Sequence, residues 1–258
     1  MNLELKNKNA LVCGSTQGIG RATAILLAKE GVNITLIARN EEKLKVVLAE
    51  LPNENQCHNY LVADFSNPNE LEKLIATNDL KFHILVNNTG GPKSGELISA
   101  TTTDLMNAFQ MHIVCNQILV KALVPFMKSE KYGRIINVIS TSVKEPIPGL
   151  GVSNTIRSAV GSWAKTLATE LGHFQITVNN VLPGFTNTSR LDEIIKIKAR
   201  NENTTEEMME RIMKNYVPAK RFAKPEETAA AVTFLASKQA GYINGINLPV
   251  DGGRTKSL

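Results

Sequence analysis

The stretch of sequence that decides the fold reads Ala10-Leu11-Val12-Cys13-Gly14-Ser15-Thr16-Gln17-Gly18-Ile19-Gly20. Its apolar beginning predicts a short buried strand, and residues 21–30 directly after it predict a helix. Glycines therefore stand where a strand turns into a helix, and because they lack a Cβ the backbone can bend there and approach an anion. Free N–H groups at the helix N-terminus attract such an anion. The spacing Gly-x-x-x-Gly-x-Gly in this context favours a turn that binds the pyrophosphate of a dinucleotide, with an ordinary tight turn as the alternative.

Short apolar runs recur along the chain, with helical segments between them. The runs lie at residues 10–13, 34–38, 60–62, 84–86, 134–139, 177–182 and 246–250. Strands that are apolar on both faces are typical of a parallel sheet covered by helices, and the connections are long enough for right-handed crossovers. The pattern predicts an α/β fold of the Rossmann type: a doubly wound, seven-stranded parallel sheet with helices on both faces.

The composition favours one soluble domain over residues 1–258, since this length can form a single α/β unit with one large core. We expect no membrane span, because no run of about eighteen apolar residues is evident. We expect a cytoplasmic location, because residues 1–9 lack the apolar core of a signal peptide. Cys13, Cys57 and Cys115 are odd in number and widely spaced, which predicts reduced thiols and no metal site.

The formal net charge of +5 raises the question of nucleic acid binding. Lys and Arg are spread along the chain without a dense basic run or an aromatic-interleaved patch, so we expect no nucleic acid partner. The same excess of positive charge favours an anionic small ligand such as a dinucleotide phosphate.

Two long helices and one irregular segment stand out from the alternating pattern. The helices are predicted at roughly 104–128 and 154–172, where apolar residues recur near helical spacing. Core packing explains most of that spacing, and a second apolar face on these helices could pair subunits. Residues 188–218 are charge-rich and helical in propensity, so we interpret them as an insertion or lid over a ligand cleft.

The end of the second predicted strand bears on the choice between NADP and NAD. Dinucleotide-binding proteins that prefer NAD usually place an acidic residue there, which binds the ribose hydroxyls of the adenosine. This chain has Arg39, whose guanidinium can pair with a 2′-phosphate, and Ser15 or Thr16 could add a hydroxyl donor. The position predicts NADP in preference to NAD, with an exposed arginine at a helix start as the alternative.

Further motifs follow the glycine turn in order along the chain: Asn87-Asn88-Thr89-Gly90 after the fourth predicted strand, Pro183-Gly184 with Thr188 after the sixth, and Val250-Asp251-Gly252-Gly253 after the seventh. On these motifs the whole chain resembles the short-chain dehydrogenase/reductase superfamily, with an overall similarity to the 3-oxoacyl-acyl-carrier-protein reductases. The resemblance implies that Asp64 contacts the adenine and that the Pro-Gly turn and Thr188 hold the nicotinamide carboxamide. The cofactor-binding residues expected in all are Gly14, Ser15, Thr16, Gln17, Gly18, Ile19, Gly20, Arg39, Asp64, Phe65, Asn88, Thr89, Gly90, Arg157, Pro183, Gly184, Thr186 and Thr188.

The reaction that the resemblance implies is hydride transfer between the nicotinamide C4 and a carbonyl or alcohol carbon of a small-molecule substrate. A tyrosine exchanges the proton, a lysine four residues later lowers the pKa of the tyrosine and binds the ribose, a serine binds the substrate oxygen, and an asparagine supports a water relay. Hydride delivery creates alkoxide character, which needs an acid beside it. Relatives of this kind usually form a homodimer or homotetramer through the two long helices.

The chain departs from that pattern at three of the four catalytic positions. Ser140 falls on the serine of the family, whereas Ser153 stands at the tyrosine position, Arg157 at the lysine position and His112 at the asparagine position. Ser153 and Arg157 are four residues apart on one helix face, so Arg157 can still reach the cofactor ribose. An aliphatic hydroxyl is a far weaker acid than a phenol of pKa about 10, so the usual proton step does not carry over.

Three functions remain open. The first is an NADP-dependent oxidoreductase in which the proton comes from His112, whose type titrates near neutrality, or from water relayed by Ser140 and Ser153. For His112 the alternative is a helix histidine that packs in the interior or meets solvent. The second is an NADP-binding sensor or regulatory protein without turnover. The third is a dehydration or isomerisation in the same cleft, to which the segment Lys144-Glu145-Pro146 could contribute charged groups, with a solvated loop as the alternative. The cofactor motifs favour the first, with Ser140, Ser153, Arg157 and His112 as candidate catalytic residues.

Overall fold

A single parallel sheet with the strand order β3-β2-β1-β4-β5-β6-β7 runs through the computed structural model, which describes residues 1–78 and 80–257. The strands are β1 Asn9–Cys13, β2 Asn33–Ala38, β3 Asn59–Val62, β4 Ile84–Asn87, β5 Gly133–Val138, β6 Ile176–Pro183 and β7 Asn247–Val250. The strand order reverses between β1 and β4, which makes the sheet doubly wound. The predicted fold class is confirmed.

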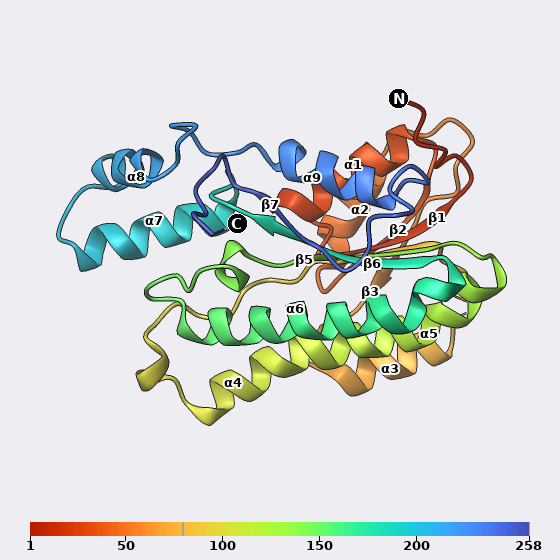
Figure 1. Ribbon diagram of the computed structural model, residues 1–258, viewed down its shortest axis with the longest axis horizontal. Coiled ribbons are helices and arrows are strands. Elements are labelled where there is room, and N and C mark those ends of the chain that lie inside the picture. Colours follow the sequence, from red (N-terminus) through yellow and green to blue (C-terminus); the bar gives the residue numbers. More distant parts are fainter. Residues whose placement is uncertain (79, 258) are drawn as a thin grey trace.

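Helices cover both faces of the sheet, as Figure 1 shows. One face carries α1 Gly18–Lys29, α2 Glu41–Glu50 and α9 Pro225–Ala236. The other carries α3 Pro68–Ala76, α5 Cys115–Ser129 and α6 Gly151–Leu171. Each layer buries its own apolar cluster, with Leu27 and Val232 in the first and Leu119 and Ala164 in the second. Burial of these side chains on both sides explains why the central strands read as continuous apolar runs.

The first predicted long helix is longer than expected and contains a local irregularity. α4 Thr102–Phe109 continues through a π-helical turn, Gln110–Val114, into α5. Such turns widen the helix by one residue and are frequent at functional sites. Here the turn directs Met111 to the ligand cleft and buries His112.

One helix in the described residues, Thr102–Ser129, is long and apolar enough by length and composition to cross a membrane. The helix is interrupted by polar residues such as Gln110, Asn116 and Lys121 and is no unbroken apolar run, so the expectation of no membrane span stays a prediction. Core helices pass the same test, and here Cys115, Leu119 and Leu123 of the helix are fully buried against the sheet and its neighbouring helices. The apolar character of this helix thus has an explanation within the fold.

Residues 188–218 form two helices, α7 Ser189–Asn201 and α8 Glu206–Asn215, which project at one end of the molecule in Figure 1. They share a small core of their own, built around Leu191, Ile195, Met209 and Met213. The helical propensity read from the sequence is confirmed. That this segment acts as a lid stays a prediction.

Candidate active site

The carboxyl ends of the central strands open into a cleft of about 600 Å³. Its walls include Gly14 after β1, Asn88 after β4, Ser140 after β5 and Gly184 after β6. The cleft therefore lies at the point where the strand order reverses, which is the usual ligand site of a doubly wound sheet. We call the part around the glycine turn the cofactor end, and the part around Ser140, Ser153 and Arg157 the catalytic end.

The glycine turn at the cofactor end requires its glycines. Gly14 and Gly18 have positive φ values of 58° and 54°, which residues with a Cβ rarely adopt. A Cβ on Gly14 would overlap the backbone oxygen of Asn88, and one on Gly20 would overlap the backbone oxygen of Gly14. The Asn88 amide donates to the carbonyl oxygens of Cys13 at 3.3 Å and Gly14 at 3.2 Å, which holds the turn against β4.

The N-terminus of α1 faces the cleft without a side-chain cap. Gln17 occupies the N-cap position and makes no capping hydrogen bond, and the first turn of α1 contains no acidic residue. The unpaired N–H groups and the helix dipole together favour an anion at this place. The residues that line it therefore fit the pyrophosphate of a dinucleotide.

Arg39, Asp64 and Phe65 line the far side of the cofactor end. Arg39 is exposed and directly follows the last residue of β2. The backbone N–H of Ser66 donates to Asp64 at 2.9 Å and, with a smaller contribution from Arg39, lowers the pKa of that carboxyl. Asp64 is therefore charged at neutral pH.

The hydroxyl of Ser15 does not face the cleft, contrary to the prediction that it could donate a hydrogen bond there. Its side chain is fully buried, its hydroxyl has no partner among the described residues, and it does not line the cleft. Thr16 does line the cleft. Of the two candidates for a hydroxyl near the 2′-phosphate, only Thr16 is placed to act.

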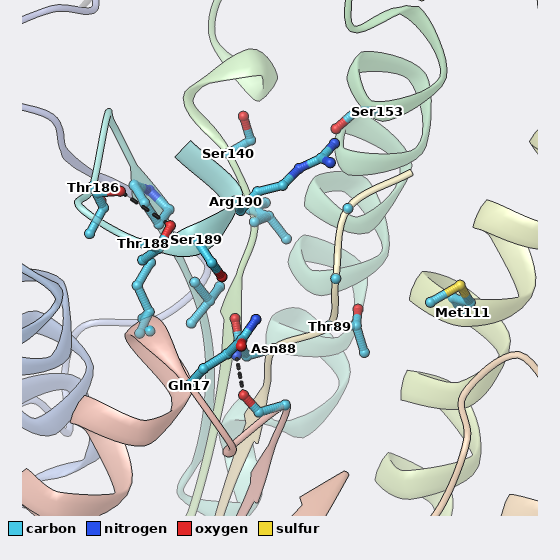
Figure 2. A pocket seen from close by; sticks show the side chains of 18 of the residues that line it. Gln17, Asn88, Thr89, Met111, Ser140, Ser153, Thr186, Thr188, Ser189 and Arg190 are labelled. Carbon is cyan, nitrogen blue, oxygen red and sulfur yellow. Dashed lines mark hydrogen bonds between the residues drawn. The ribbon is translucent and has the colours of Figure 1, made fainter. Parts of the chain in front are cut away.

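Ser140 and Ser153 face the catalytic end from two different segments, the loop after β5 and α6 (Figure 2). The Ser140 oxygen accepts a hydrogen bond from the backbone N–H of Ser142 at 3.1 Å. Because that bond uses a lone pair of Ser140, the hydroxyl proton is left to donate to a substrate oxygen.

Arg157 brings a buried positive charge to the same end of the cleft. Arg157 is only 7% exposed. Its Nη1 donates to the Val138 carbonyl at 2.9 Å, and its Nε has no partner in the described part of the chain. Burial, together with the positive charge of Arg190, lowers the pKa of Arg157 to about 10. The side chain is still a cation at neutral pH.

His112 does not reach the cleft. It is buried, and its Nδ1 lies 2.8 Å from the hydroxyl of Thr89, which itself lines the cleft. Burial, and then the charge of Arg157, lower the pKa of His112 well below its ordinary value. The expectation that His112 titrates near neutrality is therefore wrong, because the π-helical turn places it in the interior rather than at the cleft wall.

The loop after β6 closes the cleft opposite the glycine turn. Pro183, Gly184, Thr186 and Thr188 all line it, and the Thr188 hydroxyl donates to the Thr186 carbonyl at 3.2 Å. A Cβ on Gly184 would lie 2.7 Å from the Cα of Asp251. The Pro-Gly turn and the C-terminal signature are therefore packed against each other.

Comparisons with known proteins agree with this geometry. A family described as enoyl-(acyl carrier protein) reductase matches residues 14–255. Dehydrogenase/reductase SDR family member 4 of Oryctolagus cuniculus is 32% identical to this chain, over 98% of the chain and 96% of the rabbit protein. The 3-oxoacyl-[acyl-carrier-protein] reductase FabG of Rickettsia bellii (strain RML369-C) is 32% identical, over 97% and 98%.

The chain belongs to the short-chain dehydrogenase/reductase family. Among solved structures, that of L-sorbose reductase from Gluconobacter frateurii, complexed with NADPH and L-sorbose, matches with a TM-score of 0.92 and 28% identity over the full length of both chains. The chain is accordingly an oxidoreductase of the short-chain dehydrogenase/reductase type.

Sequence reasoning missed Arg190, which lines the cleft of this short-chain dehydrogenase/reductase from the first turn of α7. Its Nη2 donates to the Pro92 carbonyl at 2.9 Å, and Figure 2 shows the side chain directed across the cleft toward Ser153. The available signal was its position, two residues after the family's threonine, Thr188.

The charged residues at 144–146 do not contribute to the catalytic end as suggested. Glu145 instead accepts hydrogen bonds from the backbone N–H groups of Lys256 at 2.8 Å and Ser257 at 2.9 Å. Its carboxylate therefore holds the C-terminal segment in place. Within the described residues, no group of three or more His, Cys, Asp or Glu side chains could hold a metal ion.

Proposed function

We propose that the protein is an NADP-dependent reductase that transfers hydride between the nicotinamide and a small carbonyl or alcohol substrate, with an atypical catalytic end. The observation that carries the proposal is that one cleft joins the uncapped N-terminus of α1 to Ser140, Ser153 and Arg157. The structure of L-sorbose reductase with NADPH and a sugar substrate supports the same use of this fold.

The proposed cofactor contacts follow the walls of the cleft. Residues 14–20 would hold the pyrophosphate through backbone N–H groups, Arg39 the 2′-phosphate, and Asp64 with Phe65 the adenine. Asn88, Thr89, Gly90 and Arg157 would contact the nicotinamide ribose side, and Pro183, Gly184, Thr186 and Thr188 the carboxamide. When bound, the nicotinamide supplies or accepts the hydride.

Ser140 and Arg157 would stabilise the oxygen of the substrate. The Ser140 hydroxyl donates to that oxygen. The buried positive charge of Arg157 stabilises the negative charge that develops on the oxygen as the carbonyl carbon gains hydride. Donors placed in advance in a buried site are worth about 10²- to 10³-fold in rate each.

The proton that completes the alcohol would come from water through the serine hydroxyls. Ser153 is too weak an acid to be the source, but a hydroxyl can accept one proton as it donates another, so Ser140 and Ser153 can relay without a net change. Arg157 keeps its proton throughout, because its pKa of about 10 lies well above neutrality.

Fluorescence titration with NADPH and NADH, followed by NADPH consumption with a panel of ketones and aldehydes, tests the proposal. We expect saturable binding, tighter for NADPH, and turnover with some member of the panel. Saturable association with neither reduced coenzyme would overturn the assignment.

A cofactor-binding protein without turnover is the second candidate, and one observation favours it. The catalytic end has no acid that titrates near neutrality among its described polar side chains, which are Thr89, Ser140, Ser153, Arg157 and Arg190. Tight NADPH binding without consumption of NADPH on any carbonyl would support this candidate over the reductase.

We also propose that the protein forms a homodimer or homotetramer through the long helices. Met106 and Phe109 of α4 support this, since 58% and 42% of their surfaces are exposed. Large apolar side chains gathered on one helix are typical of an interface. Light scattering after size exclusion measures the assembly, and a monomeric mass would contradict the proposal.

A further inference from the structure

Two guanidinium groups lie in the same cleft. Arg157 comes from α6 and Arg190 from the first turn of α7, and both line the catalytic end. They are close enough that the charge of Arg190 affects the ionisation of Arg157. Like charges held together in a cleft concentrate a positive potential there and attract an anion.

No acidic side chain of the described cleft wall balances these charges at the catalytic end. Asp64 is the acidic residue among the cleft-lining residues, and it lies at the cofactor end within the influence of Arg39. Glu193 pairs with Nη1 of Arg190 at 3.1 Å, but its side chain is 63% exposed and outside the cleft wall. Solvent screens such a surface pair, so the positive charge of Arg190 remains available to a ligand.

The position of Arg190 suits a group that recognises substrate rather than cofactor. Its backbone is in the segment after the Pro-Gly turn, its Nη2 is anchored on the Pro92 carbonyl, and its side chain extends toward Ser153 on the opposite wall (Figure 2). An arginine has five N–H donors in a planar fork that matches a carboxylate, and the contacts with Pro92 and Glu193 use only part of them.

The small side chain of Ser153 contributes to this arrangement. A tyrosine, which the family resemblance implies at this position, would extend into the cleft toward which Arg190 points. Serine leaves that space open and adds a hydroxyl donor beside it. The replacement of the tyrosine and the inward direction of Arg190 therefore act together.

We propose that the substrate carries a carboxylate, and that Arg190 binds this carboxylate in the space that Ser153 leaves open, while Ser140 binds the carbonyl oxygen. The inference rests on the proposed reductase function and assigns it an oxo acid as the substrate and a hydroxy acid as the product. The carbonyl carbon gains the hydride, its oxygen gains the relayed proton, and the carboxylate takes no part in the bond changes.

Matched acids and esters test this proposal in the NADPH-loaded protein. Acetoacetate is compared with methyl acetoacetate, and 4-oxopentanoate with its methyl ester. We expect kcat/KM to be at least about tenfold higher for each acid, since the ester keeps the ketone but lacks the negative charge that Arg190 would bind. Added salt should weaken the preference for the acids. Equal or better use of the esters would overturn the proposal.

Three variants separate recognition from a structural role of Arg190. Arg190→Gln should lower kcat/KM for the acids at least about tenfold, mainly through KM, and leave the esters unchanged. Arg190→Lys should recover part of the loss, because it restores the charge without the fork. Arg200→Gln, which removes an exposed charge from the far end of the same helix, is the control and should change nothing. An equal loss for acids and esters in Arg190→Gln would show a structural role and contradict the proposal.

Binding measurements distinguish a failure of this inference from a failure of the proposed function. NADPH binding is established first by fluorescence, and the acids and esters are then titrated calorimetrically with and without NADPH. If NADPH does not bind, the reductase assignment fails. Calorimetric binding of the acids but not the esters, lost in Arg190→Gln, would then still support the carboxylate site. If NADPH binds but no acid-selective binding occurs under either condition, the carboxylate inference alone fails.

Discussion

The two ends of the cleft depend on different parts of the chain. At the cofactor end the backbone forms the site, through the positive φ of Gly14 and Gly18 and the uncapped N-terminus of α1. At the catalytic end the site consists of side chains, and Ser153 and Arg157 stand where the family resemblance implies a tyrosine and a lysine. A backbone site follows from the fold and persists with it, whereas a few side chains can change without disturbing the fold. Cofactor binding and turnover should therefore be separable by substitution.

The largest expected effect is at the backbone site. In Gly14→Ala the new Cβ would overlap the Asn88 oxygen, and the residue would keep a positive φ that costs a residue other than glycine about 1–2 kcal/mol. We expect saturable NADPH binding to be lost, or weakened more than about 100-fold, in fluorescence titrations.

Gly149→Ala is the matched control for Gly14→Ala. Gly149 has a φ of 75°, yet nothing lies within 4 Å of a Cβ placed there, and it is outside the cleft wall. This control carries the conformational cost without the close approach, so its NADPH affinity should stay near that of the wild type. Comparable losses in both variants would mean that the close packing of the turn on β4 is unimportant.

The next effect concerns chemistry without binding. Ser140→Ala removes the donor to the substrate oxygen, so kcat should fall about 100-fold while the NADPH affinity stays unchanged. Ser142→Ala is the control, because it removes a nearby buried hydroxyl that has no described partner and retains the N–H that orients Ser140. A parallel loss of NADPH affinity and turnover in Ser140→Ala would contradict the separation of the two ends.

The sheet and the glycine turn could be predicted because their causes are local in the sequence. Apolar runs in the right order mark buried parallel strands, and glycines at a strand-to-helix junction mark a backbone that must bend. Gly14, Gly18 and Gly20 accordingly lie where the sequence placed them, at the junction between β1 and the first turn of α1.

The catalytic end could be predicted only in part, because its properties arise from tertiary packing. The sequence placed Ser140, Ser153 and Arg157 in one cleft, and the structure brings them together. The burial of His112 depends on a π-helical turn, which has no clear sequence signal, and on contact with Thr89 from another element. The approach of Arg190 depends on the path of the chain after β6, which periodicity does not determine.

A smaller effect is expected at the edge of the cofactor end. Arg39→Ala removes the guanidinium proposed to bind the 2′-phosphate, so the affinity for NADPH should fall about tenfold while that for NADH changes little. The ratio of the two dissociation constants, measured by fluorescence titration, is the readout. An unchanged ratio would show that Arg39 is only a solvated residue at the start of α2 and would leave the coenzyme preference to other groups.

The smallest effect is expected for His112→Asn, which restores the residue that the family resemblance implies. Burial keeps His112 neutral, with a pKa well below its ordinary value of 6.5, so the pH profile of turnover should have no limb near 6.5 in either protein. A required protonated histidine would instead make the rate fall as the pH rises through its pKa, and the variant would lose that limb.

The stability of the protein should respond to this substitution more than its turnover does. Below pH 6.5 the histidine is protonated in the unfolded chain but stays neutral in the folded protein. The wild type should therefore lose up to about 1.4 kcal/mol of unfolding free energy for each pH unit below 6.5. Urea unfolding at several pH values should show a smaller acid loss in His112→Asn, and equal losses would mean that His112 takes up its proton in the folded state.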